Sequence, residues 1–138
     1  MAYDWHEKPT RGLFAREVLR ELGVPKTAKN MIAMLAWMAG EGTQARNNPL
    51  ATTMRWPRAT EFNAAGVKNY ATLADGIMAT SSTLRLAHYV AIRAQLSVGT
   101  SVQRVVVAIE ASPWGTQHVP WRAVNAEPER FAAMLVAS

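Results

Sequence analysis

Glu41 is the residue of this sequence whose surroundings best suit acid–base chemistry. It follows an apolar run at residues 31–38 that is typical of a buried helix, and Gly40 and Gly42 flank it. A carboxyl group beside apolar and aromatic surface is disfavoured in its ionised form, so it stays protonated closer to neutral pH. Cleavage of a glycosidic bond needs such a group as general acid. The alternative is a solvated glutamate at a frayed helix end, where glycine and charged residues are common.

Glu61 is the second carboxylate near the region where a cleft is expected. The chain has ten acidic residues. The other eight fit a chain terminus, a polar helix surface or the start of a helix: Asp4, Glu7, Glu17, Glu21, Asp75, Glu110, Glu127 and Glu129. Glycosidases usually employ two carboxyl groups, at a separation that depends on the stereochemistry. Pairing of Glu61 with Glu41 would allow hydrolysis, whereas a solvated Glu61 would leave Glu41 as the one acid.

Three short motifs follow Glu41 in order: Asn-Asn-Pro-Leu-Ala-Thr-Thr at 47–53, Phe-Asn-Ala-Ala-Gly-Val-Lys-Asn-Tyr at 62–70, and Ser-Pro-Trp-Gly-Thr at 112–116. With the apolar helix that ends near Glu41, this series resembles a lysozyme-like domain of phage and actinobacterial peptidoglycan hydrolases. The resemblance covers about residues 27–116. It implies a lysozyme-like α+β fold, in which a cleft separates a helical lobe from a small β lobe, and it implies that Glu41 is the catalytic acid.

The resemblance leaves two mechanisms open. Lysozymes hydrolyse the glycan, whereas lytic transglycosylases of this superfamily use a single Glu and close an anhydro ring with the sugar's own 6-hydroxyl. We favour the single-carboxylate mechanism, because Glu61 lacks an apolar setting. The sequence also departs from classical transglycosylases. Gly42 stands where they commonly have Ser, with Thr43 after it, and Gly66-Val67-Lys68-Asn69 replaces their Gly-Leu-Met-Gln motif.

Polar and aromatic residues at the matching positions suit sugar binding. The predicted substrate-binding residues are Thr43, Asn47, Asn48, Thr52, Thr53, Asn69, Tyr70 and Trp114. The polar side chains can bond hydroxyl and acetamido groups, and the rings of Tyr70, Trp56 and Trp114 can stack on sugars. The alternative is structural, because Asn and Thr also stabilise turns and aromatic residues also fill cores. We expect roughly half of these residues to line a cleft, the usual mix of a few polar groups in an apolar pocket.

Periodicity and capping residues predict a mostly helical α+β protein with five or six helices and a small, loop-rich β lobe. The helices are expected at about 12–22 after Thr10, 28–39 after Thr27, from a Thr72–Asp75 capping box through Leu84, from 87–88 to Gly99, from Ser101 to before Pro113, and from Asn125 or Glu127 onward. Helical periodicity fails from 41 to 70, where prolines, paired asparagines and threonines predict a long loop with one or two short strands. A loop this long in a small domain is usually functional.

Length and composition are consistent with one globular domain over residues 1–138. An N-terminal helix lies in 1–26 and a C-terminal extension is expected at 117–138. The 138 residues are 49% hydrophobic and contain no cysteine, so neither disulfides nor Cys-based metal sites are expected. The three histidines are isolated, so we expect no metal and no cofactor. The N-terminus lacks the apolar core of a signal peptide, and the run at 31–38 is too short to span a bilayer.

The net charge of +5 favours anionic partners such as the acidic polymers of a bacterial wall. The basic residues are scattered, so we expect neither a nucleic acid nor a membrane as partner. The leading hypothesis is glycan-strand cleavage of bacterial peptidoglycan by a protein carried in a phage virion, beside other tail proteins, or held in the host cytoplasm before release. The main alternative is a non-catalytic virion or wall-binding protein with the same fold. A DNA-binding helical domain is a third, favoured by the pI alone.

Overall fold

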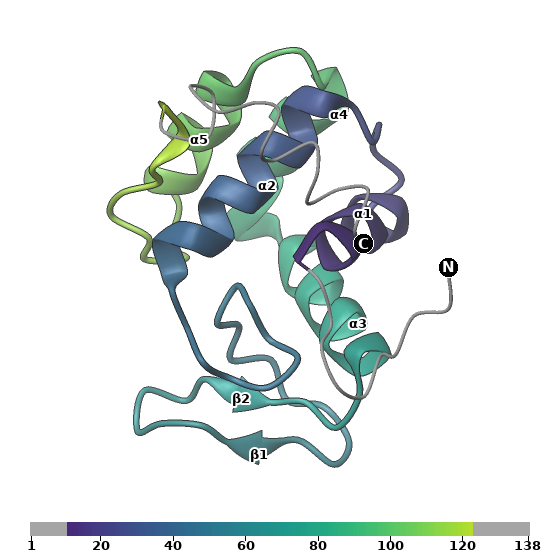
Figure 1. Ribbon diagram of the computed structural model, residues 1–138, viewed down its shortest axis with the longest axis vertical. Coiled ribbons are helices and arrows are strands. Elements are labelled where there is room, and N and C mark those ends of the chain that lie inside the picture. The colour runs from purple at the N-terminus through teal and green to yellow at the C-terminus, as the bar shows by residue number, and fades with distance from the viewer. Residues whose placement is uncertain (1–10, 123–138) are drawn as a thin grey trace.

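Five α-helices and one small antiparallel sheet make up residues 11–122, the part of the chain that the computed structural model describes (Figure 1). The elements in chain order are α1 (Arg11–Glu21), α2 (Ala28–Glu41), β1 (Thr60–Glu61), β2 (Lys68–Asn69), α3 (Leu73–Leu84), a 3-10 turn η1 (Ala87–Tyr89), α4 (Val90–Val98) and α5 (Val102–Glu110). This confirms the predicted mostly helical α+β class. The predicted last helix, from Asn125 or Glu127, lies outside the described residues, as does the Thr10 cap.

Short polar residues start three of the helices, as the sequence predicts. The hydroxyls of Thr27, Thr72 and Ser101 each accept a hydrogen bond from the backbone N–H three residues further on. Such caps satisfy N–H groups that have no partner within the helix. Glycines end two helices, because Gly42 and Gly99 adopt left-handed φ values of 57° and 73° that side chains disfavour.

Helix α2 runs through the middle of the molecule (Figure 1) and packs against α1 and α5. The side chains of Met34, Trp37 and Met38 have no exposed surface. The predicted end of this helix at residue 39 is wrong, since α2 continues to Glu41. Gly40 is helical, and the left-handed residue that ends the helix is Gly42. Glu41 therefore belongs to the last turn of α2.

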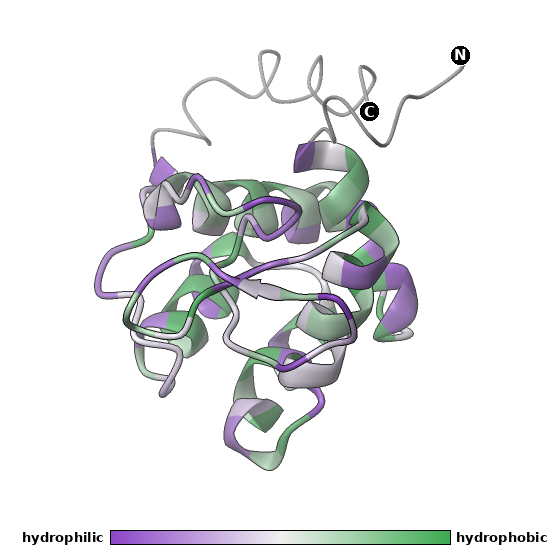
Figure 2. Ribbon diagram, turned by 90° about the horizontal axis from the view of Figure 1, so that it is seen from below, coloured by the Kyte–Doolittle hydropathy of each residue, from purple (hydrophilic) through white to green (hydrophobic). Residues whose placement is uncertain are grey.

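The long loop and the hairpin lie beyond the end of α2, below the helices in Figure 1. The two strands pair antiparallel, with Thr60 opposite Asn69 and Glu61 opposite Lys68. Figure 2 views the molecule from this side, and the hairpin is largely pale or hydrophilic where the helices carry hydrophobic stretches. Two very short strands and a polar loop thus form the predicted β region. Within residues 11–122, no helix is long and apolar enough to cross a membrane.

Candidate functional site around Glu41

Glu41 lies at the boundary between the core and the solvent. Its side chain is partly exposed at the end of α2, while Trp37, one turn earlier, is fully buried. Residues four apart on a helix lie on the same face, so the carboxylate emerges beside the buried indole. The apolar run that the sequence placed before Glu41 is indeed core, which gives the carboxylate a largely apolar neighbour on one side.

The hydroxyl of Thr116 connects these two side chains. Thr116 Oγ1 donates to Glu41 Oε1 at 2.5 Å, and Trp37 Nε1 donates to the same hydroxyl at 3.0 Å. Thr116 has 8% of its surface exposed, so this contact is mostly shielded from water. A carboxylate fixed by a residue 75 positions away in the chain belongs to the tertiary structure, which distinguishes Glu41 from a glutamate at a frayed helix end.

The segment that carries Thr116 is anchored by Trp114. The Trp114 indole donates to the carbonyl of Leu50 at 2.9 Å, and its ring meets the rings of Trp37 and Tyr89 edge to face, with centroids 4.8 Å and 5.2 Å apart. Edge-to-face aromatic pairs are favourable beyond the area they bury. Through these contacts Trp114 joins α2, η1 and the long loop. Its side chain is half-buried, so part of it can still contact a ligand.

The same segment crosses α2 closely at Gly40. A Cβ atom at Gly40 would lie 2.8 Å from the carbonyl oxygen of His118, which is closer than real Cβ contacts. Glycine here lets residues 116–119 approach the last turn of α2.

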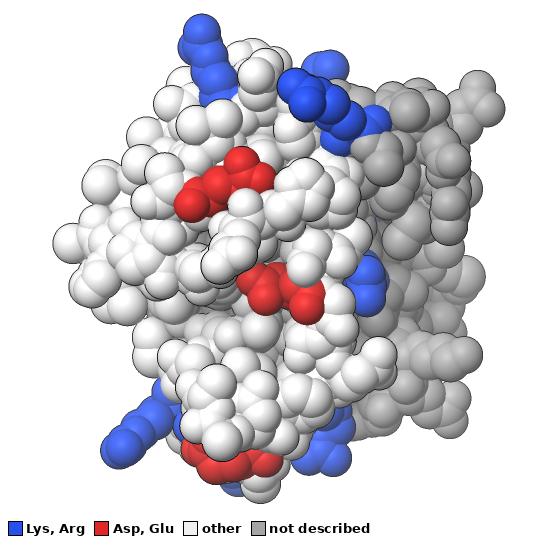
Figure 3. Space-filling view, turned by 90° about the vertical axis from the view of Figure 1, so that its left-hand side faces the viewer, with Lys and Arg blue, Asp and Glu red and all other residues white. Residues whose placement is uncertain are grey.

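Figure 3 shows the side of the molecule on which α2 ends. The acidic side chains in the upper and central parts of this view lie mainly among uncharged surface, whereas those at its lower edge lie beside Lys and Arg side chains.

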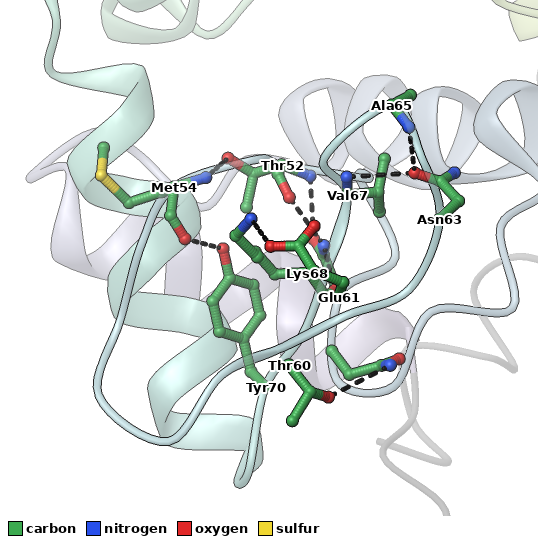
Figure 4. Close-up of polar contacts among 11 residues, drawn as sticks. Thr52, Met54, Thr60, Glu61, Asn63, Ala65, Val67, Lys68 and Tyr70 are labelled. Atoms are coloured by element: carbon green, nitrogen blue, oxygen red, sulfur yellow. Dashed lines mark hydrogen bonds and ion pairs between the residues drawn. The ribbon is translucent and has the colours of Figure 1, made fainter.

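Three of the predicted sugar-binding residues are instead buried and bonded within the loop. Asn48, Thr52 and Tyr70 expose 0%, 2% and 0% of their surface. Asn48 Nδ2 donates to the carbonyls of Thr52 and Lys68, and the Tyr70 hydroxyl donates to the carbonyl of Met54 at 2.6 Å (Figure 4). Burial raises the Tyr70 pKa to about 12. None of these three side chains faces solvent, so sugar contact by Asn48, Thr52 and Tyr70 stays a prediction that their burial argues against.

The other polar loop residues keep partial exposure. Asn47 Nδ2 donates to the carbonyl of Tyr70, Asn69 Oδ1 accepts from the N–H of Arg46, and the Thr43 hydroxyl accepts from the N–H of Ala45. Thr53 is exposed. Sugar contact by Thr43, Asn47, Thr53, Asn69 and Trp114 stays a prediction, although Thr43, Asn47 and Asn69 already bond backbone groups of the loop.

Glu61 has a different environment from Glu41. It lies on β1 with 63% of its side chain exposed, and it forms an ion pair with Lys68, its partner across the hairpin (Figure 4). A pocket of about 320 Å³ beside this pair is lined by Arg55, Trp56, Ala59, Glu61 and Lys68. The pair gives Glu61 a structural partner on the hairpin.

Thr116 is the site residue that sequence reasoning missed. It closes the Ser-Pro-Trp-Gly-Thr motif at 112–116, in which the sequence assigns a role to the side chain of Trp114 alone. The sequence signal that could have pointed to Thr116 is its hydroxyl at the end of this motif, which follows the helix α5. Among residues 11–122, no group of three or more His, Cys, Asp or Glu side chains is placed to hold a metal ion. Comparisons with known protein families, curated proteins and solved structures find no match to this chain.

Proposed function

We propose that this chain cleaves the glycan strands of bacterial peptidoglycan on a lysozyme-like fold, with Glu41 as general acid and base. The observation that carries the proposal is the fixed carboxylate at the end of the buried helix α2, held by Thr116 and backed by Trp37. General acids and bases need a defined geometry and a suitable environment. The motif series that resembles peptidoglycan hydrolases supports the same residue.

Glu61 is mostly exposed and already paired with Lys68, which favours the single-carboxylate mechanism of a lytic transglycosylase. In this mechanism Glu41 donates its proton to the glycosidic oxygen as the bond to the leaving sugar breaks. The resulting carboxylate then takes the proton from the 6-hydroxyl of the remaining sugar. That oxygen bonds to the anomeric carbon, so the product is a 1,6-anhydro sugar and Glu41 regains its proton. Hydrolysis with Glu61 as second carboxylate is the competing route.

Glu41→Gln tests the proposal, because Gln keeps the shape and a hydrogen-bond acceptor but cannot donate the proton. We expect loss of wall lysis by ~10²–10⁴-fold, with the free energy of unfolding changed by less than about 1 kcal/mol. Turbidity of a purified wall suspension measures the rate, and mass spectrometry of the released sugars separates anhydro ends from reducing ends.

Glu110→Gln is the matched control. Glu110 Oε2 accepts from the N–H of Val119, so this carboxylate bonds the segment that carries Thr116 at a different residue. Its loss should leave lysis close to the parent rate. Equal lysis by the Glu41→Gln variant and the parent would exclude Glu41 as the acid.

A non-catalytic wall-binding or virion protein is the second candidate. The pocket beside the hairpin favours it, because Trp56 offers a ring for stacking and Arg55 and Lys68 offer positive charge to an acidic wall polymer. Such a protein would bind wall fragments without releasing sugars. In both cases we infer that the protein acts at the bacterial wall, in a virion with other tail proteins or after release from the host.

A further inference from the structure

The hydrogen bonds around Thr116 have a direction that chemistry fixes. An indole Nε1–H can only donate, so Trp37 must donate to the Thr116 hydroxyl. A hydroxyl has one proton of its own. With the bond from Trp37 already accepted, that proton is directed at Glu41 Oε1, 2.5 Å away. Trp37, Thr116 and Glu41 therefore form a relay whose donors all point from the core toward the carboxylate.

This direction makes the two carboxylate oxygens unequal. If Glu41 were protonated on Oε1, the Thr116 hydroxyl would have to accept that proton and would lose the acceptor for its own. A mostly buried hydroxyl donor without an acceptor is costly. A proton on Oε2 leaves the relay intact. Oε1 is thus the oxygen that stays unprotonated, and Oε2 is the oxygen that exchanges a proton with a substrate.

We propose that Thr116 is a positioning residue for Glu41, which holds Oε1 and thereby presents Oε2 as the acid–base oxygen. The inference rests on the proposed function, because it assigns a role within that reaction. The relay is held firmly on the protein side. Trp37 is fully buried, the Trp114 indole is bonded to Leu50, and Gly40 admits the segment that carries Thr116.

A pair of substitutions separates positioning from simple packing. Thr116→Val keeps the shape and removes the hydroxyl, whereas Thr116→Ser keeps the hydroxyl and removes a methyl group. We expect Thr116→Val to lower kcat for wall lysis between about tenfold and a hundredfold, the range for a misplaced catalytic group, with little change in KM. Thr116→Ser should restore most of the rate. An unchanged kcat in Thr116→Val, or a loss confined to KM, would overturn the proposal.

A spectroscopic readout tests the relay without relying on activity. In two-dimensional ¹H–¹⁵N spectra of the full chain, the indole N–H resonance of Trp37 should move when Glu41→Gln replaces the carboxylate of the relay with an amide. Glu41→Gln should leave the resonance in place when Thr116→Val is already present and should still move it in Thr116→Ser, whereas Glu110→Gln alone should not move it. The Glu110 control matters because that carboxylate also bonds the segment that carries Thr116, through the N–H of Val119.

The two readouts keep the failures apart. A Trp37 indole resonance that is unchanged by Glu41→Gln contradicts the relay, whatever the activity of the parent. A parent whose Trp37 resonance responds to Glu41→Gln but that cleaves no wall contradicts the proposed function, and the relay is then a structural contact with no role in positioning an acid. If Thr116→Val does not fold, the parent, Glu41→Gln and Thr116→Ser spectra still decide whether the relay exists.

Discussion

The end of α2 and the β1–β2 hairpin each carry a glutamate with a bonded partner, but the two regions hold their glutamates differently. Glu41 stands against a fully buried indole and is bonded by a hydroxyl from a distant segment. Glu61 is mostly exposed and pairs with the residue opposite it on a two-residue ladder. Lys68 exposes 13% of its side chain, but the Glu61 carboxylate lies in solvent, and a pair with a solvated partner contributes about 1 kcal/mol. The difference indicates that the fold determines the geometry of Glu41, while Glu61 is free to change partner.

Two helical glycines, one in the last turn of α2 and one on α3, are each approached closely by a backbone carbonyl. At Gly40 of α2 the crossing atom is the carbonyl oxygen of His118, 2.8 Å from where a Cβ would lie. At Gly76 of α3 it is the carbonyl oxygen of Asn47, only 1.8 Å away. One glycine admits the segment that positions Glu41, and the other admits the polar loop. Substituting each tests which anchor matters for activity and which for stability.

Gly76→Ala should give the largest effect on stability. Ala is a better helix former than Gly by about 1 kcal/mol, so propensity alone predicts stabilisation. The clash with Asn47 cannot be relieved by turning a side chain, because the atom is backbone. We expect the free energy of unfolding to fall by about 3 kcal/mol or more, measured by urea unfolding followed by circular dichroism. A variant as stable as the parent would show that the loop does not rest on α3.

Gly40→Ala is the matched comparison at the other anchor. Its contact is longer, so a loss of about 1 kcal/mol in the free energy of unfolding is expected. The rate of wall lysis should fall by more than this loss of stability explains, since the displaced segment carries Thr116. If both variants lose stability equally and Gly40→Ala keeps full activity, the α2 end is no more functional than the loop.

The sequence predicts the helices well, because their signals are local. Apolar spacing and the caps Thr27, Thr72 and Ser101 all act within one or two turns. The end of α2 was misplaced by two residues. Of the glycines flanking Glu41, only Gly42 has the left-handed backbone that ends the helix, and sequence does not distinguish a helical glycine from a capping one.

The site is only half predictable for a related reason. The apolar run before Glu41 marks the carboxylate, but Thr116 meets it across 75 positions, and no local pattern encodes that contact. Asn48 and Tyr70 have the residue types of a sugar site and also those of a braced loop. Burial decides between these roles, and burial is a property of the tertiary structure. Polar residues in a long loop are therefore ambiguous until their partners are known.

Asn48→Ala should give the next largest loss in the free energy of unfolding after Gly76→Ala. The long loop is held by polar contacts of this residue, whereas α2 is held by apolar burial. Asn48 is fully buried, and its Oδ1 accepts from the N–H of Thr52 while its Nδ2 serves two carbonyls. Unsatisfied buried groups cost about 1–3 kcal/mol each, so we expect a loss of about 2 kcal/mol in urea unfolding. Thr53→Ala, at the exposed neighbour, should stay within about 0.5 kcal/mol. A similar result for both would mean that Asn48 does not brace the loop.

Tyr70→Phe should cost about 1 kcal/mol, the usual worth of one hydrogen bond, here the one to the Met54 carbonyl. The pKa of Tyr70 is raised by burial from 10.0 to about 12, so the fold favours the neutral phenol. The stability that the raised pKa of Tyr70 contributes is complete below pH 10 and is lost as the pH rises toward about 12. Tyr70→Phe should flatten the fall in stability over that window. Burial raises the pKa of Tyr89 as well, so Tyr89→Phe is the control that measures the share of this second phenol in the fall. An unchanged slope in Tyr70→Phe would contradict the assignment.

Glu61→Gln should have the smallest effect, and it tests the comparison between the two glutamates most directly. Loss of the pair with Lys68 should lower the free energy of unfolding by at most about 1 kcal/mol, and less at high salt, where exposed charges are screened. If Glu41 acts alone, lysis should stay within roughly tenfold of the parent, a barrier change of about 1.4 kcal/mol, and the products should keep anhydro ends. A collapse in rate with reducing-end products would make Glu61 the second carboxylate of a hydrolase. It would also mean that an exposed ion pair on a short hairpin opens to serve the reaction, so exposure would no longer separate the two glutamates.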